Sequence, residues 1–327
     1  MASDGGRVWE AVVGAASPST AGALAAIDCG TNSTRLLVTD TEGQTLRRLM
    51  RVTRLGQGVD ATGRLAPSAI DRTVAVLREY RQVMEQHGVG RARLVATSAA
   101  RDAANAADFF AAAEQVTGVA PELLSGLEEG QLSFAGATAR LPEGIGRDEP
   151  VLVCDIGGGS TELVVGRPDR REAVAACSLD VGCVRLTERH LVGDPPTAGE
   201  LAEARAAVTG PVAQARRDLP DLAGDGPVVG LAGTVSTLAS LAQGVAGYDR
   251  RRVHHAVLRR SEVEHWLSEL AERPASGRMD LPGMVEGRQD VIVGGALVLA
   301  MVMEVFERAT CLVSEDDILD GLVASLR

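Results

Sequence analysis

The sequence predicts a mixed α/β protein built from two related domains. The chain has 327 residues, of which 45% are hydrophobic and 24% charged, so it is long enough for two domains with separate cores. Short apolar segments alternate with longer amphipathic ones along the chain, as in α/β folds. A strand–turn–strand motif near the N-terminus recurs in the second half. This recurrence predicts that the two domains share one plan.

The repeated motif aligns without gaps between residues 27–38, IDCGTNSTRLLV, and residues 154–165, CDIGGGSTELVV. The aspartate, the first glycine of the turn and the Ser-Thr pair occupy the same places in both copies. Each copy therefore predicts an apolar strand, an Asp-x-Gly turn and a second strand. Glycine permits a sharp turn and lets a ligand approach the backbone closely.

The chemistry of these turns suits phosphate. Backbone N–H groups in a Gly/Ser/Thr bend form a concave anion-binding surface, and the hydroxyls add further donors. A carboxylate repels phosphate, so Asp28 and Asp155 are expected to bind Mg²⁺, either directly or through water. The alternatives are a plain hairpin without a ligand and an aspartate that caps its own turn.

The remaining elements of the first half alternate in type. Residues 67–86 have the pattern of an amphipathic helix, with Ser68 and Asp71 as a capping box and Gly88 as its end. The other expected elements are strands at 45–55, 93–97 and 121–125, a helix after residue 98 and a helix that begins near Glu128 and Glu129.

The second half continues the alternation, and a segment rich in glycine and proline at 141–150 marks the expected domain boundary, with a cleft between the halves. The apolar stretch at 291–302 is too short to span a bilayer, so we expect a buried helix and no membrane association. The expected elements are strands at 172–178, 228–234 and 311–313, with the second strand ending in a turn at Gly233-Thr234, and helices at 198–217, 262–272, 290–308 and the C-terminus.

Composition excludes several classes of protein. The chain contains no lysine, so the GxxxxGK[ST] phosphate loop is impossible, and no GxGxxG occurs. A net charge of −11 argues against nucleic-acid binding, although arginines cluster at 47–54 and 250–260 and would suit a polyanion. Five scattered cysteines argue against a disulfide framework or a zinc site. The first 21 residues resemble a flexible tail rather than a signal peptide, so a cytoplasmic location is expected.

Seven segments identify a family resemblance, and they cover nearly the whole chain from Leu24. The segments AAIDCGTNSTRLLV, VATSAARDAANA, LSGLEEGQLSFAG, VCDIGGGSTELVVG, GLAGTVSTLA, GRQDVIVGGALVL and SEDDILDGL occur in the order seen in exopolyphosphatases and guanosine pentaphosphate phosphohydrolases. The chain most resembles the short, two-domain actinobacterial form. The resemblance implies two ribonuclease H-like domains of the acetate kinase, sugar kinase and actin superfamily around an interdomain cleft.

The implied domains are a tail at 1–21, domain I at 22–145 and domain II at 146–311, with segment 312–327 returning to domain I. The resemblance also implies roles for individual residues. Glu129 matches the catalytic base that orients the attacking water, with Glu162 as a helper in water activation. Arg101 matches the arginine that neutralises the transferred phosphoryl group. The implied phosphate-binding residues are Asn32, Ser33, Arg35, Gly157, Gly158, Gly159, Ser160, Thr161, Gly233 and Thr234.

The expected activity is the Mg²⁺-dependent release of terminal orthophosphate from inorganic polyphosphate, with guanosine pentaphosphate as another substrate. Homodimers are common in the family, so a homodimer is one expectation for this chain. Two alternatives stay open from the residues: a kinase of the same fold, which would transfer phosphate to another acceptor, and a non-catalytic sensor of polyphosphate or guanosine pentaphosphate.

Overall fold

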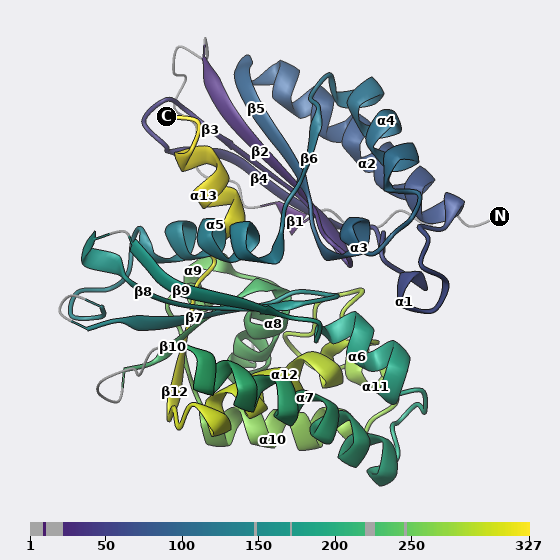
Figure 1. Cartoon of the computed structure of the whole chain (residues 1–327), viewed down its shortest axis with the longest axis vertical. Helices are drawn as coiled ribbons and strands as arrows, with labels where there is room; N and C mark the ends of the chain where they lie inside the picture. Colours follow the sequence, from purple (N-terminus) through teal and green to yellow (C-terminus); the bar gives the residue numbers. More distant parts are fainter. Residues whose placement is uncertain (1–8, 11–21, 147–148, 171, 220–225, 245–246) are drawn as a thin grey trace. The chain divides into compact units, whose positions relative to one another are not determined.

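The computed structural model in Figure 1 describes residues 9–10, 22–146, 149–170, 172–219, 226–244 and 247–327. Of the expected tail at 1–21, only Trp9 and Glu10 lie within the described residues, and they form the short strand β1. The chain divides into two compact units. The first unit extends to Leu124 and also includes the C-terminal residues Leu322–Arg327. The second unit runs from Ser125 to Gly321.

The first unit contains a six-stranded sheet in the order β1-β4-β3-β2-β5-β6. Strands β2, β3 and β4 form an antiparallel meander, while β5 and β6 continue the sheet in parallel with β2. The strands are β1 Trp9–Glu10, β2 Ala23–Cys29, β3 Ser33–Thr39, β4 Thr45–Val52, β5 Val89–Ala96 and β6 Pro121–Leu123.

Helices α2 and α4 cover one face of this sheet (Figure 1). Ile27 and Leu36 point to this face because strand side chains alternate, and they share a core with Tyr80 of α2 and Phe109 of α4. The helices of the unit are α1 Val59–Thr62, α2 Pro67–Gln86, α3 Ser98–Arg101 and α4 Ala106–Thr117.

The start of α2 differs from the expectation. Its bounds are those predicted, but no side chain caps its first turn, so the predicted capping box of Ser68 and Asp71 is wrong. Pro67 occupies the first helical turn instead, where its missing N–H leaves no donor unsatisfied.

The second unit repeats the plan of the first. Its sheet has the order β11-β12-β10-β7-β8-β9, in which β7, β8 and β9 form an antiparallel meander and β10 and β12 run parallel to β7. Counted from the repeated hairpin, both sheets therefore place their first four strands in the order third, second, first, fourth, and the second sheet continues with β12 before β11. The strands are β7 Val151–Ile156, β8 Thr161–Arg167, β9 Glu172–Leu179, β10 Val228–Leu231, β11 Val257–Arg259 and β12 Thr310–Val313. This common order confirms the predicted pair of related α/β domains.

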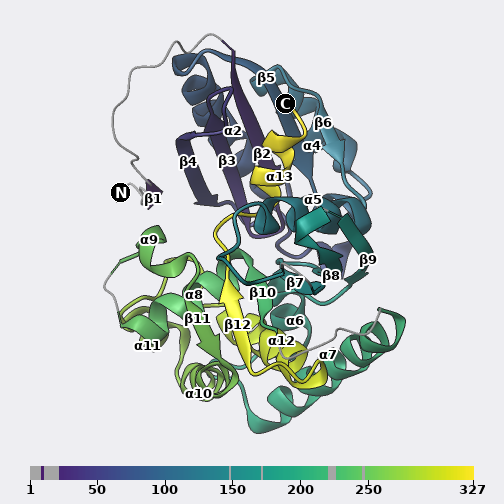
Figure 2. The ribbon, with the colours of Figure 1, turned by 90° about the vertical axis from the view of Figure 1, so that its left-hand side faces the viewer.

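The helices of the second unit lie on both faces of its sheet. Helix α5 packs on one face, where Phe134 joins Val153 and Val164 in a small core. The larger core lies on the other face, where α7, α10 and α12 lie together (Figure 2). The helices are α5 Gly126–Thr138, the short 3-10 helix η1 Pro168–Arg170, α6 Cys183–His190, α7 Ala198–Asp218, α8 Ala232–Gln243, α9 Arg250–Val253, α10 Arg260–Ala271, α11 Ala275–Met279, α12 Ile292–Val305 and α13 Ile318–Ala324.

The division between the units falls earlier than residue 145. Helix α5 packs on β7, β8 and β9, so residues 125–145 lie with the second sheet. Only residues 322–327 of the C-terminal segment join the first unit, where Arg93 NH1 donates a hydrogen bond of 2.7 Å to Ser325 Oγ. Among the described residues, no helix combines the length and apolarity needed to cross a membrane.

Candidate functional site

The two repeated turns are closed by the same hydrogen bond. In the first unit Gly30 N donates to Ser33 O at 3.0 Å, and in the second unit Gly157 N donates to Ser160 O at 3.0 Å. A Cβ atom added at Gly30 would lie 3.2 Å from Ser33 O, and one added at Gly157 would lie 3.0 Å from Ser160 O. A side chain at either glycine would crowd the carbonyl that closes its turn, and this shared geometry supports the duplication inferred from the sequence.

In the first turn, the buried side chain of Asn32 offers a hydrogen-bond donor. The residue is 5% exposed, and within the described part of the chain its Nδ2 has no hydrogen-bond partner. Its carbonyl accepts from Thr53 N at 3.1 Å and Arg54 N at 2.9 Å, and Arg54 adopts a left-handed φ of 49°. The loop after β4 thus holds the turn in place, and the Asn32 amide is suited to an anionic ligand.

Asp28 and Arg35 form an ion pair beside this turn. They are opposite each other in the register of β2 and β3, and Arg35 NH2 lies 2.6 Å from Asp28 Oδ2. Arg35 therefore supplies positive charge at Asp28, in the place where a metal ion was expected. The predicted arginine Arg101 ends α3, and its NH1 donates to the carbonyl of Leu124 at 2.9 Å.

In the second turn, the carbonyl groups face helix α6 and leave two amides for a ligand. Cys183 N donates to Gly157 O at 3.0 Å and Val184 N donates to Gly158 O at 2.8 Å, so the turn caps the N-terminus of α6. In the described structure, the amides of Gly158 and Gly159 make no backbone hydrogen bond. These two N–H groups are the donors that a bound phosphate would use.

The hydroxyl groups of Thr161 and Ser160 hydrogen-bond to other groups of the protein. The Thr161 hydroxyl is fully buried and donates to the carbonyl of Val181. The Ser160 hydroxyl hydrogen-bonds the Glu162 carboxylate. Both side chains were predicted to bind phosphate, and the structure gives each of their hydroxyls a partner in its own unit.

Strand alternation brings the acidic residues of the second unit to one face of the sheet. Asp155 pairs with Glu162 across β7 and β8, and Glu162 pairs with Ser178 across β8 and β9, so all three side chains share a face. Helix α5 covers this face. Its Ser133 Oγ donates to Asp155 Oδ2 at 2.6 Å, and one turn earlier it presents Glu129.

Burial and like charges raise the pKa of Glu162 well above its usual range. Burial is the largest cause, followed by the negative charges of Glu129 and Asp155, while hydrogen bonds from Ser178 and Ser160 oppose the shift. Ser178 Oγ donates to Glu162 Oε1 at 2.8 Å, and Oε2 is buried without a hydrogen-bond partner in the described residues. Glu129, Asp155 and Glu162 are all buried, so a positive charge or a proton is needed among them.

Two features of α5 explain how Glu129 reaches this face. Ser125 and Glu128 form a capping box, in which Glu128 Oε2 accepts from Ser125 N at 2.8 Å, so the neighbour of Glu129 serves the helix end. Gly126 and Gly130 let the helix approach the strands. A Cβ atom added at Gly126 would lie 2.3 Å from Ser178 Cβ, and one added at Gly130 would lie 2.9 Å from a Val164 methyl group.

Gly233 and Thr234 form the first turn of α8 rather than a free turn. The helix begins at Ala232, which has a left-handed φ of 67°. Thr234 is 1% exposed, and its hydroxyl hydrogen-bonds the Cys183 thiol. A Cβ atom added at Gly233 would lie 2.1 Å from the Arg288 guanidinium carbon, so the arginine packs directly on this glycine.

Sequence reasoning missed four polar residues around these groups. Ser133 and Ser178 hold Asp155 and Glu162, and only the packing of α5 and the strand register reveal them. Arg185 Nε donates to Gly159 O at 2.7 Å, and buried Arg288 lies against Gly233. Arg288 stands in the quoted GRQD segment, which was the one available signal for it.

Several arginines of the two clusters have acidic partners. The sequence assigned no catalytic role to His190, His254 and His255; in the structure His254 and His255 stack on each other with ring centroids 3.7 Å apart. The ion pairs are Arg51 with Glu79, Arg250 with Asp316, Arg259 with Glu262, and Arg260 with Glu264.

The acidic face of the second unit fits the donor chemistry of Mg²⁺. Among the described residues, no three His, Cys, Asp or Glu side chains are placed to enclose a metal ion by themselves. Mg²⁺ commonly uses one or two carboxylates and retains several waters, so Asp155 and the Oε2 atom of Glu162 suffice as protein ligands. Asp28 fits less well because Arg35 already compensates its charge.

Comparison with known sequences places the chain beside one group of phosphatases. A family model described as the Ppx/GppA phosphatase family matches residues 37–326. The chain is 44% identical over 320 residues to Exopolyphosphatase 2 of Mycobacterium tuberculosis, covering 93% of this chain and 98% of that protein. It is 31% identical over 304 residues to a Guanosine-5'-triphosphate,3'-diphosphate pyrophosphatase of Vibrio cholerae, covering 91% of this chain and 58% of that protein.

Solved structures agree with the sequence comparison. The structure of an exopolyphosphatase-like protein matches with a TM-score of 0.84 and 37% identity, covering 93% of this chain and 97% of that chain. The crystal structure of the Aquifex aeolicus Ppx/GppA family member matches with a TM-score of 0.76 and 30% identity over the same shares of the two chains.

Proposed function

Because the chain belongs to the Ppx/GppA phosphatase family, we propose that it hydrolyses the terminal phosphoanhydride bond of a linear phosphate chain, with water as the acceptor. The water oxygen forms a bond to the terminal phosphorus, and the bond from that phosphorus to the bridging oxygen breaks. Orthophosphate and a chain shortened by one phosphate leave. The observation that carries the proposal is the buried acidic face that α5 completes in the second unit.

Glu129 is the proposed base. It lies in the first turn of α5 and is 9% exposed, beside the two carboxylates of the strands. The charge of Glu129 helps to raise the pKa of Glu162, so the two carboxyl groups interact in the same buried region, where a glutamate can accept a proton from water. Glu162 and its serine partners help to hold that water.

The turn of each unit binds phosphate groups in this proposal. Asn32 Nδ2 and the amides of Gly158 and Gly159 provide donors that the described residues leave available. Asp155 and Glu162 would hold Mg²⁺, which when bound supplies positive charge to the phosphate oxygens. Arg101 adds charge neutralisation for the transferred group, as the family resemblance implies.

We propose inorganic polyphosphate as the first substrate to test and guanosine pentaphosphate as the second. The relative named Exopolyphosphatase 2 shares 44% of aligned residues with the chain, compared with 31% for the named guanosine pyrophosphatase. Both compounds end in the same anhydride. Phosphate release from long polyphosphate, short polyphosphate and guanosine pentaphosphate, each with and without Mg²⁺, ranks them directly.

The decisive variant is Glu129→Gln, which removes the base and keeps the size of the side chain. We expect kcat for phosphate release to fall by about 10²- to 10⁴-fold. Glu128→Gln is the matched control, because glutamine also completes a capping box with Ser125, and its kcat should stay near that of the parent.

A Glu129→Gln variant with the parent rate would reject Glu129 as the base. Binding of polyphosphate by the parent without any release would instead favour the sensor. Formation of ADP from ATP only when a phosphate acceptor other than water is present would favour a kinase.

A further inference from the structure

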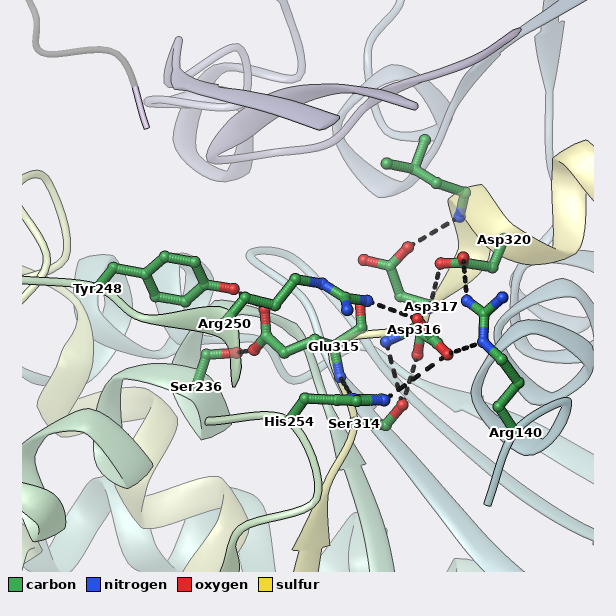
Figure 3. A network of polar contacts seen from close by, with 11 residues as sticks. Arg140, Ser236, Tyr248, Arg250, His254, Ser314, Glu315, Asp316, Asp317 and Asp320 are labelled. Carbon is green, nitrogen blue, oxygen red and sulfur yellow. Dashed lines mark hydrogen bonds and ion pairs between the residues drawn. The ribbon is translucent and has the colours of Figure 1, made fainter. Parts of the chain in front are cut away.

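A loop of three consecutive acidic residues follows strand β12, which lies between β11 and β10, and each residue makes different contacts (Figure 3). Glu315 accepts hydrogen bonds from Ser236 of α8 and from the Tyr248 hydroxyl. Asp317 Oδ1 accepts from Leu319 N at 2.9 Å at the start of α13. Asp316 lies between these two and faces arginines. The loop thus joins several elements of the second unit at the carboxyl end of its sheet.

Asp316 is a buried carboxylate held by two guanidinium groups. It is 1% exposed, Arg250 NH2 donates to its Oδ1 at 2.5 Å, and Arg140 Nε donates to its Oδ2 at 2.9 Å. His254 Nδ1 accepts from Glu315 N at 3.0 Å, which fixes the loop from the other side. The Asp316 carboxylate is desolvated although the Arg140 side chain is 57% exposed, and its two charge-assisted hydrogen bonds strengthen the connection.

Arg140 connects this carboxylate to the end of α5. The helix ends at Thr138 with Ala139 as its C-cap, and Arg140 follows directly. Besides Asp316, the guanidinium reaches Asp320, with NH2 at 3.3 Å from Oδ1. Figure 3 shows both carboxylates turned towards Arg140. The last turn of α5 is therefore tied to the loop by two acidic partners.

Glycine contacts bring α5 into direct backbone contact with the loop at Asp317 and with helix α13 at Gly321. A Cβ atom added at Gly136 of α5 would lie 1.9 Å from the carbonyl oxygen of Asp317. A Cβ atom added at Gly321 would lie 2.1 Å from the carbonyl oxygen of Leu132. Packing at this distance leaves no flexible side chain between the two backbones, so a displaced loop moves α5 with it.

We propose that Arg140 and Asp316 are positioning residues that fix the direction of α5 and thereby the place of Glu129. The proposal rests on the proposed function for its catalytic consequence. A rise of 1.5 Å per residue along the helix axis puts Glu129 and Arg140 about 16 Å apart. A tilt of about 5° at the Arg140 end would then move Glu129 by more than about 1 Å, a displacement that can cost about 10²-fold in rate.

The test compares Arg140→Ala and Asp316→Asn with a matched control, Arg205→Ala. Arg205 is about as exposed as Arg140 and pairs with Glu304, but it joins α7 to α12 and does not touch α5. We expect Arg140→Ala and Asp316→Asn to lower kcat for phosphate release by at least about tenfold, with KM changed by less than about threefold. The Arg205→Ala control should keep both constants.

Two further measurements separate positioning from a general loss of structure. Arg140→Lys keeps the positive charge beside Asp316 and should restore part of kcat, and it also replaces Arg140→Ala if that variant does not fold. Amide hydrogen exchange should become faster in residues 132–138 of α5 and stay unchanged in α7.

Unchanged kcat in Arg140→Ala and Asp316→Asn would overturn the proposal. A change in KM as large as the fall in kcat would also overturn it. If the parent itself released no phosphate, the proposed function would fail. Amide exchange in α5 would then still decide the structural part, because unchanged exchange would reject the connection.

Discussion

Because α5 contacts the loop after β12 closely, we expect Gly136→Ala to destabilise the protein, although a glycine-to-alanine change inside a helix usually stabilises it. Replacing a helical glycine by alanine normally stabilises a helix by up to about 1 kcal/mol. In Gly136→Ala, however, the new methyl group would lie 1.9 Å from the Asp317 carbonyl oxygen and 2.9 Å from Gly321 N. Both atoms belong to the backbone, so neither can move aside by a rotamer change.

The magnitude follows from two opposing contributions. Overpacking costs about 1–3 kcal/mol, and contact with fixed backbone atoms puts this site at the upper end of that range. Subtracting about 1 kcal/mol of helix preference leaves a net destabilisation of about 2 kcal/mol. For a unit of this size, that loss lowers the melting temperature by about 4–8 °C.

Thermal unfolding followed by circular dichroism measures this difference. Gly210→Ala is the control, because Gly210 lies inside α7 and an added Cβ atom would meet nothing within 4 Å apart from its chain neighbours. Pro211 follows it and disfavours a helical residue with a Cβ atom at this position, so the gain in helix preference is offset and the stability should stay within about 1 kcal/mol of the parent. If Gly136→Ala proved as stable as Gly210→Ala, the close packing of α5 against the loop would be refuted.

Two further predictions concern buried ionisable groups. Because burial raises the pKa of Glu162, its ionised form destabilises the ligand-free protein increasingly as pH rises above the ordinary value of 4.5. Glu162→Gln should therefore stabilise the ligand-free protein against urea at pH 7 while phosphate release falls, and lower stability would count against this reasoning. Burial also lowers the pKa of His254 from 6.5 to about 4, so stability is lost as pH falls from about 6.5 towards 4, by at most about 3 kcal/mol. His254→Asn should reduce the dependence of the unfolding free energy on pH between about 6.5 and 4. His265→Asn, at an exposed position, should leave this dependence unchanged. A pH dependence that His254→Asn did not alter would show that another group is responsible.

The sequence predicted those elements whose signals are local. The two hairpins follow from Asp-x-Gly turns between apolar strands, and the bounds of α2 follow from its amphipathic pattern and Pro67. Helix α6 was missed because it is short and its first amides are capped by the distant carbonyls of Gly157 and Gly158. The edge strand β11 was missed because three residues carry no measurable alternation.

The same distinction holds for the site. Asp28 with Arg35 and Asp155 with Glu162 are symmetric about their turns, so their pairing follows from hairpin register, although the sequence reading did not use it. The contact of Ser133 with Asp155 depends on how α5 packs against the sheet, which no local pattern reveals.

The duplicated hairpin shows how a copied framework can diverge through a single position. Both copies keep the closing hydrogen bond and the leading aspartate, yet the residue facing that aspartate is Arg35 in one and Glu162 in the other. The first copy is thereby close to electroneutral, whereas the second accumulates negative charge. Two hairpins with the same strand register thus differ in net charge at one pair of facing side chains.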